Sequence, residues 1–425
     1  MENRNNRNSR KQEIINLAKN SKKASLILSA ASGKLKRKAI INMYESLISY
    51  KDKVIQANEL DIKEAQKSGM RDHLLKRLII DNKVFNYMAE RIKKVADLSD
   101  PVGRILHGET RPNGLIVKKV SVPLGVILII YESRPNVTTD AAAVCIKSGN
   151  AVILRGGSGS LRTNMVLTEA MVKAVTDAGL PEETIQIVKT SGHEPVNELL
   201  KLDKYIDVVI PRGGKGLIKA VAEQSRIPVI KHYEGICHLY IAADADKDMA
   251  VRLALNSKVQ RVEVCNALET LLVDKQIAEN ILPIIAEEFS KRKVELRGCE
   301  ITRKIIPDHT VPATDEDWRT EYLAPILSVK VVNNTEEAVE HINKYGSGHT
   351  DIIATKNLET AQYFVNTVDS ASVLVNASTR LSGGGDYGLG AVIGISTDKL
   401  HARGPVGPSD LTSYKWIAYG NGHLR

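Results

Sequence analysis

The feature that most limits the fold of this chain is a repeated alternation of short apolar runs with longer helical segments. The first run, residues 126–131, reads Val-Ile-Leu-Ile-Ile-Tyr, and a segment of small residues with helical character follows at 139–147. Runs of β-branched residues favour strands, and a crossover helix returns the chain as a parallel strand. The alternation therefore predicts an α/β fold with a parallel, doubly wound sheet. The further strands expected in this series are 151–154, 184–188 and 206–210, with helices at 161–178 and 217–224.

A second series of the same kind begins near residue 254, so we expect more than one domain. A length of 425 residues also exceeds what one hydrophobic core usually supports. We expect one domain over residues 1–255, a second over 256–382 and a Gly-rich tail over 383–425. A hairpin at about 115–130 should interrupt the first domain, and the tail should pair with that hairpin or with a neighbouring subunit. The strands expected in the second series are 268–273, 323–332, 351–354 and 372–375, with helices at 276–290, 336–343 and 358–366.

The net charge of +9 is concentrated at one end of the chain. Residues 1–40 hold 11 Lys and Arg against 2 Glu, so the remainder is balanced. No aromatic residues are interleaved with these cations, whereas proteins that bind RNA or single strands stack bases on aromatic side chains. Residues 12–96 show the three- and four-residue apolar spacing of helices. We therefore interpret the basic segment as the solvated face of a helix, not as a nucleic-acid site.

The four cysteines lie far apart in the sequence and form no CxxC pair. That spacing fits neither a zinc site nor the disulfide framework of a secreted protein, so reduced thiols in a cytoplasmic protein are expected. No apolar segment typical of a signal peptide follows residues 1–10, and no apolar run approaches the ~20 residues of a membrane helix. The histidines and carboxylates show no ligand spacing, so the sequence predicts no metal site. The cysteines are Cys145, Cys237, Cys265 and Cys299.

Two glycine turns follow expected strands and lead into expected helices. Glycines let a backbone approach a ligand, and the amino end of the next helix offers free N–H groups to a phosphate. Neither turn is a GxGxxG fingerprint, and Lys215 is not followed by the Ser or Thr of a P-loop. Tight strand-to-helix turns also use glycine for steric reasons alone, so dinucleotide binding and a structural role are equally open. The turns are Arg155-Gly156-Gly157 and Arg212-Gly213-Gly214.

Cys265 differs from the other three cysteines in its setting. It falls in a polar connection between an expected helix and the strand at 268–273, with Arg261 four residues before it. A nearby guanidinium stabilises a thiolate, which is the nucleophilic form of cysteine. Asn136 follows the strand at 126–131, where a side-chain amide either caps a turn or donates to an oxyanion. From position alone, a structural role remains the alternative for Cys265.

Five segments carry a family resemblance: 131–138 (YESRPNVT), 147–157 (KSGNAVILRGG), 265–273 (CNALETLLV), 376–380 (NASTR) and 400–405 (LHARGP). The likeness runs in unbroken order from about residue 10 to the C-terminus. It resembles the gamma-glutamyl phosphate reductase family, the proline-biosynthesis branch of the aldehyde dehydrogenase superfamily. The resemblance implies a Rossmann-like cofactor domain, a catalytic α/β domain and a β oligomerisation arm built from the hairpin and the tail, and hence a homo-oligomer.

The resemblance also implies an activity. The expected enzyme is an NADP-dependent phosphorylating aldehyde dehydrogenase, a glutamate-5-semialdehyde dehydrogenase. Its reaction is the NADPH-dependent reduction of L-glutamyl 5-phosphate to L-glutamate 5-semialdehyde and phosphate, the second step of proline biosynthesis. The partners implied are this small acyl phosphate and further copies of the chain, with glutamate 5-kinase as a further candidate and no nucleic acid or membrane.

Roles for single residues follow from the same resemblance. Cys265 takes the nucleophile's position, so its thiolate is expected to attack the acyl phosphate and hold the acyl group as a thioester. Asn136 takes the position of the oxyanion-hole amide, and Glu321 that of the glutamate that holds the nicotinamide ribose. Arg380 and Arg261 are candidates for the substrate's carboxylate or phosphate, because guanidinium groups bind both bidentately. By this resemblance, Arg155, Gly156 and Gly157 are expected to contact the cofactor's adenosine ribose and phosphates. The second glycine turn adds Arg212, Gly213 and Gly214 as expected cofactor-binding residues.

One departure from the family pattern and one further glutamate motivate other functions. Val262 and Glu263 stand where the family usually has a proline and a small residue, and a carboxylate facing the thiol would disfavour the thiolate. That change motivates a rival interpretation as a non-catalytic scaffold for the glutamate kinase. Glu234 falls near the glutamate with which hydrolysing relatives activate water. An NAD(P)-dependent aldehyde dehydrogenase that hydrolyses its thioester is therefore the second rival.

Overall fold

The computed structural model describes residues 2–70, 72–132, 134–190 and 192–425, and the chain divides into two compact units. The break falls between Lys231 and His232, so the boundary expected near residue 256 is wrong. The reason is that β7 (Cys237–Ile241) pairs on both sides with strands of the second unit's sheet. The expected tail domain is divided as well, because part of it belongs to each unit. The first unit is Met1–Lys231, Gly388–Gly394 and Val406–Arg425, and the second is His232–Tyr387 and Ile395–Pro405.

The first unit is built around a parallel sheet with the strand order β5 (Ile185–Ile187), β4 (Ala151–Gly156), β3 (Val126–Tyr131) and β6 (Val208–Arg212). β3 is buried along its whole length because it lies inside the sheet and helices cover both faces. Alternate β3 residues pack in one core with side chains of three helices, and two further helices contact the sheet outside that core. The first three are α1 (Glu2–Ser29), α8 (Glu194–Leu199) and α9 (Lys215–Gln224), and the other two are α6 (Asn136–Lys147) and α7 (Leu161–Ala178).

An additional layer of helices comes from the N-terminal part of the chain. α2 (Gly33–Ser49) and α5 (Asn82–Asp97) pack on α6, and α2 also packs on α7. α3 (Lys51–Lys67) contacts α7 as well, and the Asp61 carboxylate accepts from the Thr163 N–H at 2.8 Å. The short α4 (Asp72–Leu78) connects this layer. The helical spacing expected over residues 12–96 is therefore confirmed.

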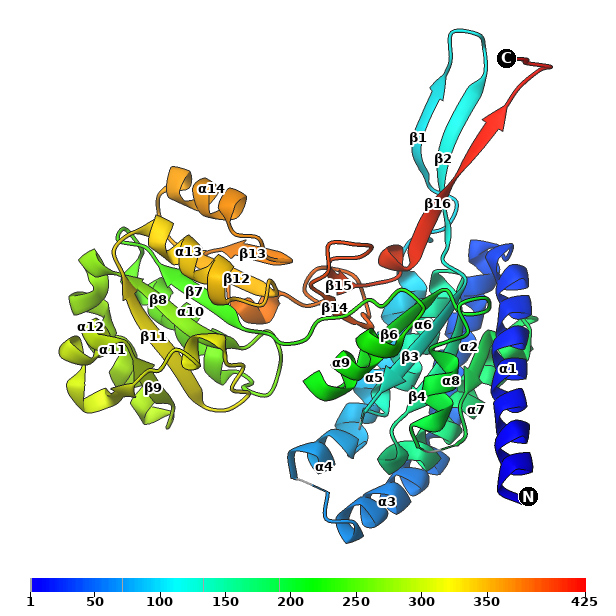
Figure 1. Cartoon of the computed structure of the whole chain (residues 1–425), viewed down its shortest axis with the longest axis horizontal. Helices are drawn as coiled ribbons and strands as arrows, with labels where there is room; N and C mark the ends of the chain where they lie inside the picture. Colours follow the sequence, from blue (N-terminus) through cyan, green and yellow to red (C-terminus); the bar gives the residue numbers. More distant parts are fainter. Residues whose placement is uncertain (1, 71, 133, 191) are drawn as a thin grey trace. The chain divides into compact units, whose positions relative to one another are not determined.

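An antiparallel ribbon of three strands extends from the first unit: β1 (Ile105–Thr110), β2 (Ile116–Pro123) and β16 (Thr412–Tyr419) (Figure 1). The tail was expected to pair either with the hairpin or with a neighbouring subunit. It pairs with β2 of the hairpin, and Tyr419 lies opposite Ile116. The hairpin expected at 115–130 is wrong in its second strand. Residues 126–131 form β3 of the parallel sheet, because that all-apolar run is buried on both faces. The hairpin instead joins β1 to β2.

The second unit contains a parallel sheet of seven strands. β7 lies between β8 and β12. The strand expected at 323–332 begins later, because Leu323 adopts a left-handed conformation with φ of 51° that a strand does not admit. The strand order is β10 (Thr310–Pro312), β9 (Glu295–Gly298), β11 (Ile326–Val332), β8 (Leu268–Asp274), β7, β12 (Thr350–Ala354) and β13 (Ser372–Val375).

Helices cover both faces of this second sheet (Figure 1). Along β7, Leu239 and Ile241 pack with α10 (Lys247–Val259) and α11 (Lys275–Lys291), whereas Tyr240 packs with α13 (Thr335–Tyr345) and α14 (Leu358–Thr367). Asp274 ends β8 and its side chain accepts from the Gln276 N–H at 2.9 Å. One aspartate therefore closes the strand and caps the next helix. The doubly wound arrangement expected from the alternation is confirmed.

Short elements complete the chain. α12 (Glu300–Ile305) follows β9, and β14 (Gly394–Ser396) pairs with β15 (Gly404–Val406). Within the described ranges, no helix is long and apolar enough to cross a bilayer. The 3₁₀ turns are η1 (Ser158–Ser160), η2 (Glu182–Thr184), η3 (Pro307–His309), η4 (Asp317–Arg319), η5 (Thr379–Leu381) and η6 (Ser409–Leu411).

Candidate active site

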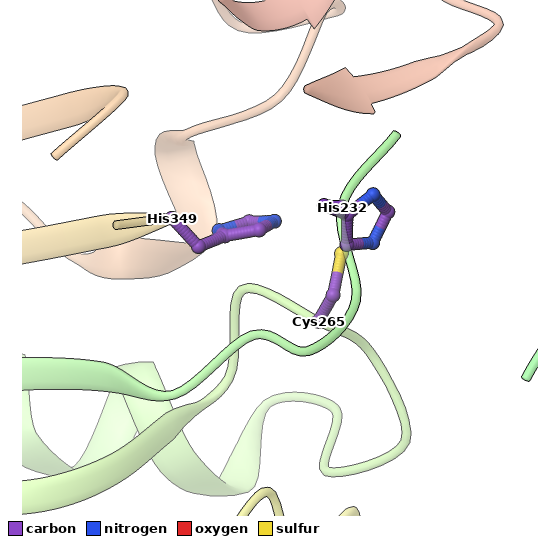
Figure 2. Close-up of side chains that lie close together, drawn as sticks. All are labelled: His232, Cys265 and His349. Carbon is purple, nitrogen blue, oxygen red and sulfur yellow. The ribbon is translucent and has the colours of Figure 1, made fainter. Parts of the chain in front are cut away.

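The amino ends of three neighbouring strands in the second unit bring a thiol and two imidazoles together. Cys265 lies before β8, His349 lies directly before β12, and His232 precedes β7, the strand between them. Parallel strands start at the same edge of a sheet, so residues far apart in the sequence meet there. One ligand atom from each side chain lies within 4.8 Å of the other two. Figure 2 shows the Cys265 sulfur pointing toward His232, with the His349 ring directed into the same space.

The loop that carries Cys265 is held by close backbone packing. It connects α10, which ends at Val259, to β8, as the sequence predicted. The Ala267 N–H donates to the Val264 carbonyl at 3.0 Å and closes a turn around the cysteine. Gly235 packs against this turn, and a Cβ at that position would lie 1.8 Å from the Cys265 carbonyl oxygen. Only glycine fits at 235, so the backbone at the thiol is fixed by the neighbouring segment.

The four thiols differ in burial, and this separates Cys265 from the rest. Cys145 and Cys237 are buried, and burial raises the pKa of both thiols. Cys237 donates its S–H to the Cys265 carbonyl at 3.2 Å and so supports the loop. Cys299 is half-buried, but its sulfur accepts from the Thr302 N–H at 3.5 Å at the start of α12. Cys265 is the half-buried thiol that has two histidines beside it.

Both imidazoles are oriented by hydrogen bonds on their Nδ1 atoms. His232 Nδ1 lies 2.8 Å from the Ile395 carbonyl oxygen, which only accepts, so Nδ1 carries a proton. A neutral His232 therefore keeps its lone pair on Nε2. His349 Nδ1 lies 2.9 Å from the Thr350 hydroxyl, and that hydroxyl is 2.6 Å from the Ser382 Oγ. The two rings are 5.5 Å apart and meet edge to face. These contacts fix how each ring faces the sulfur.

The two arginines expected to bind substrate both lie in the second unit. Arg380 is half-buried in η5, and its Nε donates to the Gln260 side chain at 2.8 Å. Burial lowers the pKa of Arg380, and the nearby charge of Arg261 lowers it further, whereas Cys265 acts in the opposite direction. These influences mean that Arg261, Arg380 and Cys265 lie within electrostatic reach of one another. Glu263 is exposed, where solvent weakens its effect on the thiol.

An amide fixes the arginine segment to the cysteine loop. The side chain of Asn266, next to the thiol, is buried and donates to the Arg380 carbonyl at 3.4 Å and to the Ser382 carbonyl at 3.3 Å. The Ser378 hydroxyl lies 3.0 Å from that of Ser257 in α10. The segment 376–380, which carries part of the family resemblance, therefore lies against the segment 265–273, which carries another part.

Glu321 is also attached to this loop region. Its Oε1 accepts from the Gly235 N–H at 2.9 Å, and Gly235 packs on Cys265. Two residues after Glu321, the Leu323 N–H donates to Glu269 at 3.3 Å. Glu269 also forms a fully buried ion pair with Lys258 at 2.6 Å. Burial raises the pKa of Glu269 to about 7. The role expected for Glu321, holding the nicotinamide ribose, stays a prediction.

In the first unit, Arg155 lies at the carboxyl end of β4. Its guanidinium donates to the Gly156 carbonyl at 3.1 Å and to the Gly192 carbonyl, and its Nε is buried without a hydrogen-bond partner among the described residues. Burial lowers the pKa of Arg155. A Cβ at Gly156 would lie 2.1 Å from the Asn164 amide nitrogen of α7. Packing alone thus requires Gly156, whereas Arg155 keeps a donor for which the described residues supply no acceptor. Gly157 caps η1.

The second glycine turn holds an acidic side chain that sequence reasoning missed. Arg212 ends β6, and Gly214 caps α9. The Gly214 N–H donates to the Glu132 carboxylate at 2.9 Å, and a Cβ at Gly213 would lie 2.5 Å from the same carboxylate. A carboxylate therefore occupies the amino end of the helix, where the sequence predicted a phosphate. Glu132 must move aside before an anion can bind there.

Asn136 is the first residue of α6 in the first unit, whereas Cys265 lies in the second. The half-buried side chain of Asn136 donates to the Asp140 carboxylate at 3.3 Å. Arg91 holds the other oxygen of that carboxylate at 2.8 Å. The action expected of Asn136, donation to an oxyanion at Cys265, stays a prediction.

Comparison with known proteins connects these features to a family. A model of the aldehyde dehydrogenase family matches residues 5–301 and 309–388. Gamma-glutamyl phosphate reductase of Caldanaerobacter subterraneus subsp. tengcongensis is 50% identical over 413 residues, which is 97% of this chain and 100% of that protein. The protein of the same name from Carboxydothermus hydrogenoformans is 48% identical over 413 residues, which is 97% of this chain and 99% of that protein.

Solved structures confirm the expected aldehyde-dehydrogenase-like α/β fold. Gamma-glutamyl phosphate reductase from Thermotoga maritima matches with a TM-score of 0.94 at 43% identity, over 97% of this chain and 100% of that chain. A glyceraldehyde-3-phosphate dehydrogenase from Methanocaldococcus jannaschii, solved with NADP, matches over 97% of this chain and 95% of that chain. Its TM-score of 0.66 at 14% identity shows a shared fold. This chain therefore belongs to the aldehyde dehydrogenase family and, within it, to the gamma-glutamyl phosphate reductases.

Proposed function

We propose that the chain reduces L-glutamyl 5-phosphate to L-glutamate 5-semialdehyde and phosphate, with NADPH as the reductant and Cys265 as the nucleophile. The observation that carries this proposal is the half-buried thiol of Cys265 beside His232 and His349 (Figure 2). Near-full-length identity of 50% to a gamma-glutamyl phosphate reductase supports the substrate. The reaction is the second step of proline biosynthesis.

The thiol chemistry follows from the residues around the sulfur. An imidazole beside a thiol takes up its proton and raises the fraction of thiolate. His232 suits this role, because its Nδ1 is held by Ile395 and Nε2 is the nitrogen that accepts. The Cys265 thiolate then attacks the acyl carbon, the C–O bond to phosphate breaks, and a thioester forms. After reduction, collapse of the thiohemiacetal breaks the C–S bond, releases the aldehyde and restores the thiolate.

The substrate carries two anionic groups, and two guanidinium groups lie near the thiol. Arg380 and Arg261 are the proposed partners of the substrate carboxylate and phosphate, since guanidinium forks bind both bidentately. The Asn266 contacts hold the Arg380 backbone against the cysteine loop. Asn136 is proposed to donate to the oxyanion that forms when the sulfur attacks.

NADPH, when bound, supplies the hydride that reduces the thioester. Arg155 fits its 2′-phosphate, because the buried Nε has no acceptor among the described residues and the guanidinium matches a phosphate. The backbone at Gly156, Gly157, Gly213 and Gly214 is proposed to approach the diphosphate, with Arg212 beside it, and Glu321 to hold the nicotinamide ribose. The preference for NADPH over NADH rests on Arg155.

The ribbon of β1, β2 and β16 is proposed to join copies of the chain. It exposes large apolar side chains that a lone subunit leaves in water: Ile105 is 61% exposed, Leu106 55% and Trp416 59%. A neighbouring subunit would cover them. Glutamate 5-kinase, which makes the labile substrate, remains a candidate partner, and the four free thiols support the cytoplasm as the compartment.

The reaction run in reverse tests this function. Wild type with glutamate semialdehyde and NADP⁺ should reduce more than one equivalent of NADP⁺ per subunit only when phosphate is present, because phosphate is needed to release the acyl group. Cys265→Ser should lower the rate at least ~10⁴-fold, since the nucleophile is lost. Cys299→Ser, which changes a half-buried thiol elsewhere, should keep full activity.

A hydrolysing aldehyde dehydrogenase is the second candidate. Glu234 favours it, because it directly precedes Gly235, whose backbone packs on Cys265. In that case NADP⁺ reduction would proceed without phosphate and Glu234→Gln would abolish it. A wild type that reduces no NADP⁺, together with a Cys265→Ser variant that keeps the cellular role of the chain, would reject both enzymes and leave the scaffold.

A further inference from the structure

We propose that Cys265, His232 and His349 form a binding site for a thiophilic divalent cation such as Zn²⁺, and that the bound cation withdraws the sulfur from reaction. The site goes beyond the reductase activity, because neither hydride transfer nor acyl transfer uses a metal. Only its consequence for catalysis rests on the proposed function.

The three ligand atoms lie near enough to one another for small side-chain movements to form a tetrahedral zinc site. Zn–S bonds of about 2.3 Å and Zn–N bonds of about 2.0–2.1 Å place the ligand atoms of such a site roughly 3.4–3.6 Å apart. The ligand atoms of Cys265, His232 and His349 lie within 4.8 Å of one another. Figure 2 shows the sulfur and the two rings converging on one space. Rotations about the side-chain bonds that move each atom by about an ångström would close the site.

Hydrogen bonds to the other ring nitrogens support both imidazoles as ligands. Metal-binding histidines usually donate their second N–H to a carbonyl, a carboxylate or water, which fixes the tautomer and the direction of the ring. His232 Nδ1–H donates to the Ile395 carbonyl at 2.8 Å, which assigns Nε2 to the metal. His349 Nδ1 lies 2.9 Å from the Thr350 hydroxyl, which can donate or accept, so this contact occupies Nδ1 and leaves Nε2 for the metal without fixing which nitrogen carries the proton. Both rings are thus held as a metal site requires.

The donor set also selects the cation. One thiolate and two imidazoles suit Zn²⁺ and similar borderline metals, whereas Mg²⁺ and Ca²⁺ require oxygen ligands. Three protein ligands leave a fourth position for water. On binding, the Cys265 thiol releases its proton to solvent and an S–Zn bond forms, with no transfer of electrons. The charges of Arg261 and Arg380 oppose a cation here, so we expect reversible binding that a chelator removes.

Co²⁺ tests the site directly, because a tetrahedral Co²⁺–thiolate site has a charge-transfer absorption that does not depend on enzyme activity. The full chain is titrated with Co²⁺, and Zn²⁺ is then added to displace it. Wild type and the control Cys299→Ser should develop the band at one equivalent and lose it with Zn²⁺. Cys265→Ser should show no band, and His232→Gln and His349→Gln should bind at least ~10-fold more weakly.

Three results would overturn the proposal: no band in wild type, a band that persists in Cys265→Ser, or histidine variants that bind as well as wild type. The last would show a lone thiol taking up metal adventitiously. A second measurement on wild type alone covers the case in which a variant fails to fold. One equivalent of Zn²⁺ should slow alkylation of Cys265 by iodoacetamide at least ~10-fold, mapped by mass spectrometry, and chelation should restore it; unslowed alkylation contradicts the site. If the metal-free chain shows no reductase activity, the proposed function is rejected. The Co²⁺ and alkylation tests of the metal site would still apply.

Discussion

The two parallel sheets of this protein differ in which ends of their strands carry the candidate functional residues. In the first unit, Arg155 and Arg212 lie at the carboxyl ends of β4 and β6. In the second unit, Cys265 and His349 lie before the amino ends of β8 and β12. Ligands of open α/β sheets usually bind at the carboxyl ends. The first sheet follows that rule and the second departs from it.

This difference decides which residues a sequence reveals. At a carboxyl end, the strand, the glycine turn and the next helix are contiguous, so the signal is local. At an amino end, the participating side chains come from separate strands, and only the sheet joins them. The glycine turns were therefore visible in the sequence, whereas the histidines beside Cys265 were not.

Among variants that keep the Cys265 thiol, the largest effect is expected from Asn136, which tests whether the first unit contributes to chemistry at the second unit's thiol. Asn136→Ala should lower kcat about 10²- to 10³-fold, the usual loss for one oxyanion donor. The KM for the acyl substrate should change little. The exposed Asn366→Ala in α14 serves as the control and should leave kcat unchanged. An unaltered kcat in Asn136→Ala would confine the chemistry to the second unit.

Arg155 should separate the two cofactors. Arg155→Ala should raise the KM for NADPH about 10- to 100-fold, because a charge-assisted bond to the 2′-phosphate is lost, and leave the KM for NADH nearly unchanged. Arg155→Lys keeps the charge without the fork and should fall between. An equal loss for both cofactors would mean that Arg155 supports the fold and not the phosphate.

Stability should depend on pH through a histidine of the second unit. His341 is buried, and burial lowers its pKa from 6.5 to about 2. The unfolded chain binds a proton below pH 6.5 and the folded chain does not, so stability is complete above that pH and falls as the pH decreases. The expected slope is about 1.4 kcal/mol per pH unit. Urea unfolding at pH 5–7 measures it; His341→Gln should flatten the slope, and the exposed His107→Gln should not. An unchanged slope in His341→Gln would contradict the assignment.

The smallest effect concerns Glu132 at the amino end of α9. Glu132→Gln should tighten NADPH binding about 2- to 5-fold, because it removes a negative charge that competes with a phosphate at the helix end. Glu223→Gln, farther along α9, is the matched control. Weaker binding in Glu132→Gln would show that the carboxylate assists the cofactor.

Local patterns were sufficient for most of the fold. The helix expected at 161–178 and the strand expected at 372–375 have those same bounds as α7 and β13. The sheet that β7 joins could not be predicted, because its membership is set by pairing with β8 and β12 in the folded chain. The domain boundary was misplaced for the same reason.

The site was predictable where a motif was contiguous. Cys265 and its loop were found from position and resemblance, and the structure places Arg380 beside them through Asn266. His349 and Cys265 each lie just before an expected strand. That shared position was the signal that could have placed the two side chains together. Glu132 could not be inferred, because its contact with Gly214 joins the ends of β3 and β6, which are paired only in the folded sheet.

The central claim is that the sulfur of Cys265 carries the acyl group. Wild type is incubated with glutamate semialdehyde and NADP⁺ without phosphate, quenched in acid, digested and mapped by mass spectrometry. The account predicts a glutamyl mass increment on the peptide that contains Cys265, which disappears when phosphate is added before the quench. An enzyme that turns over with phosphate yet never shows the adduct, or shows it on another residue, would contradict the account.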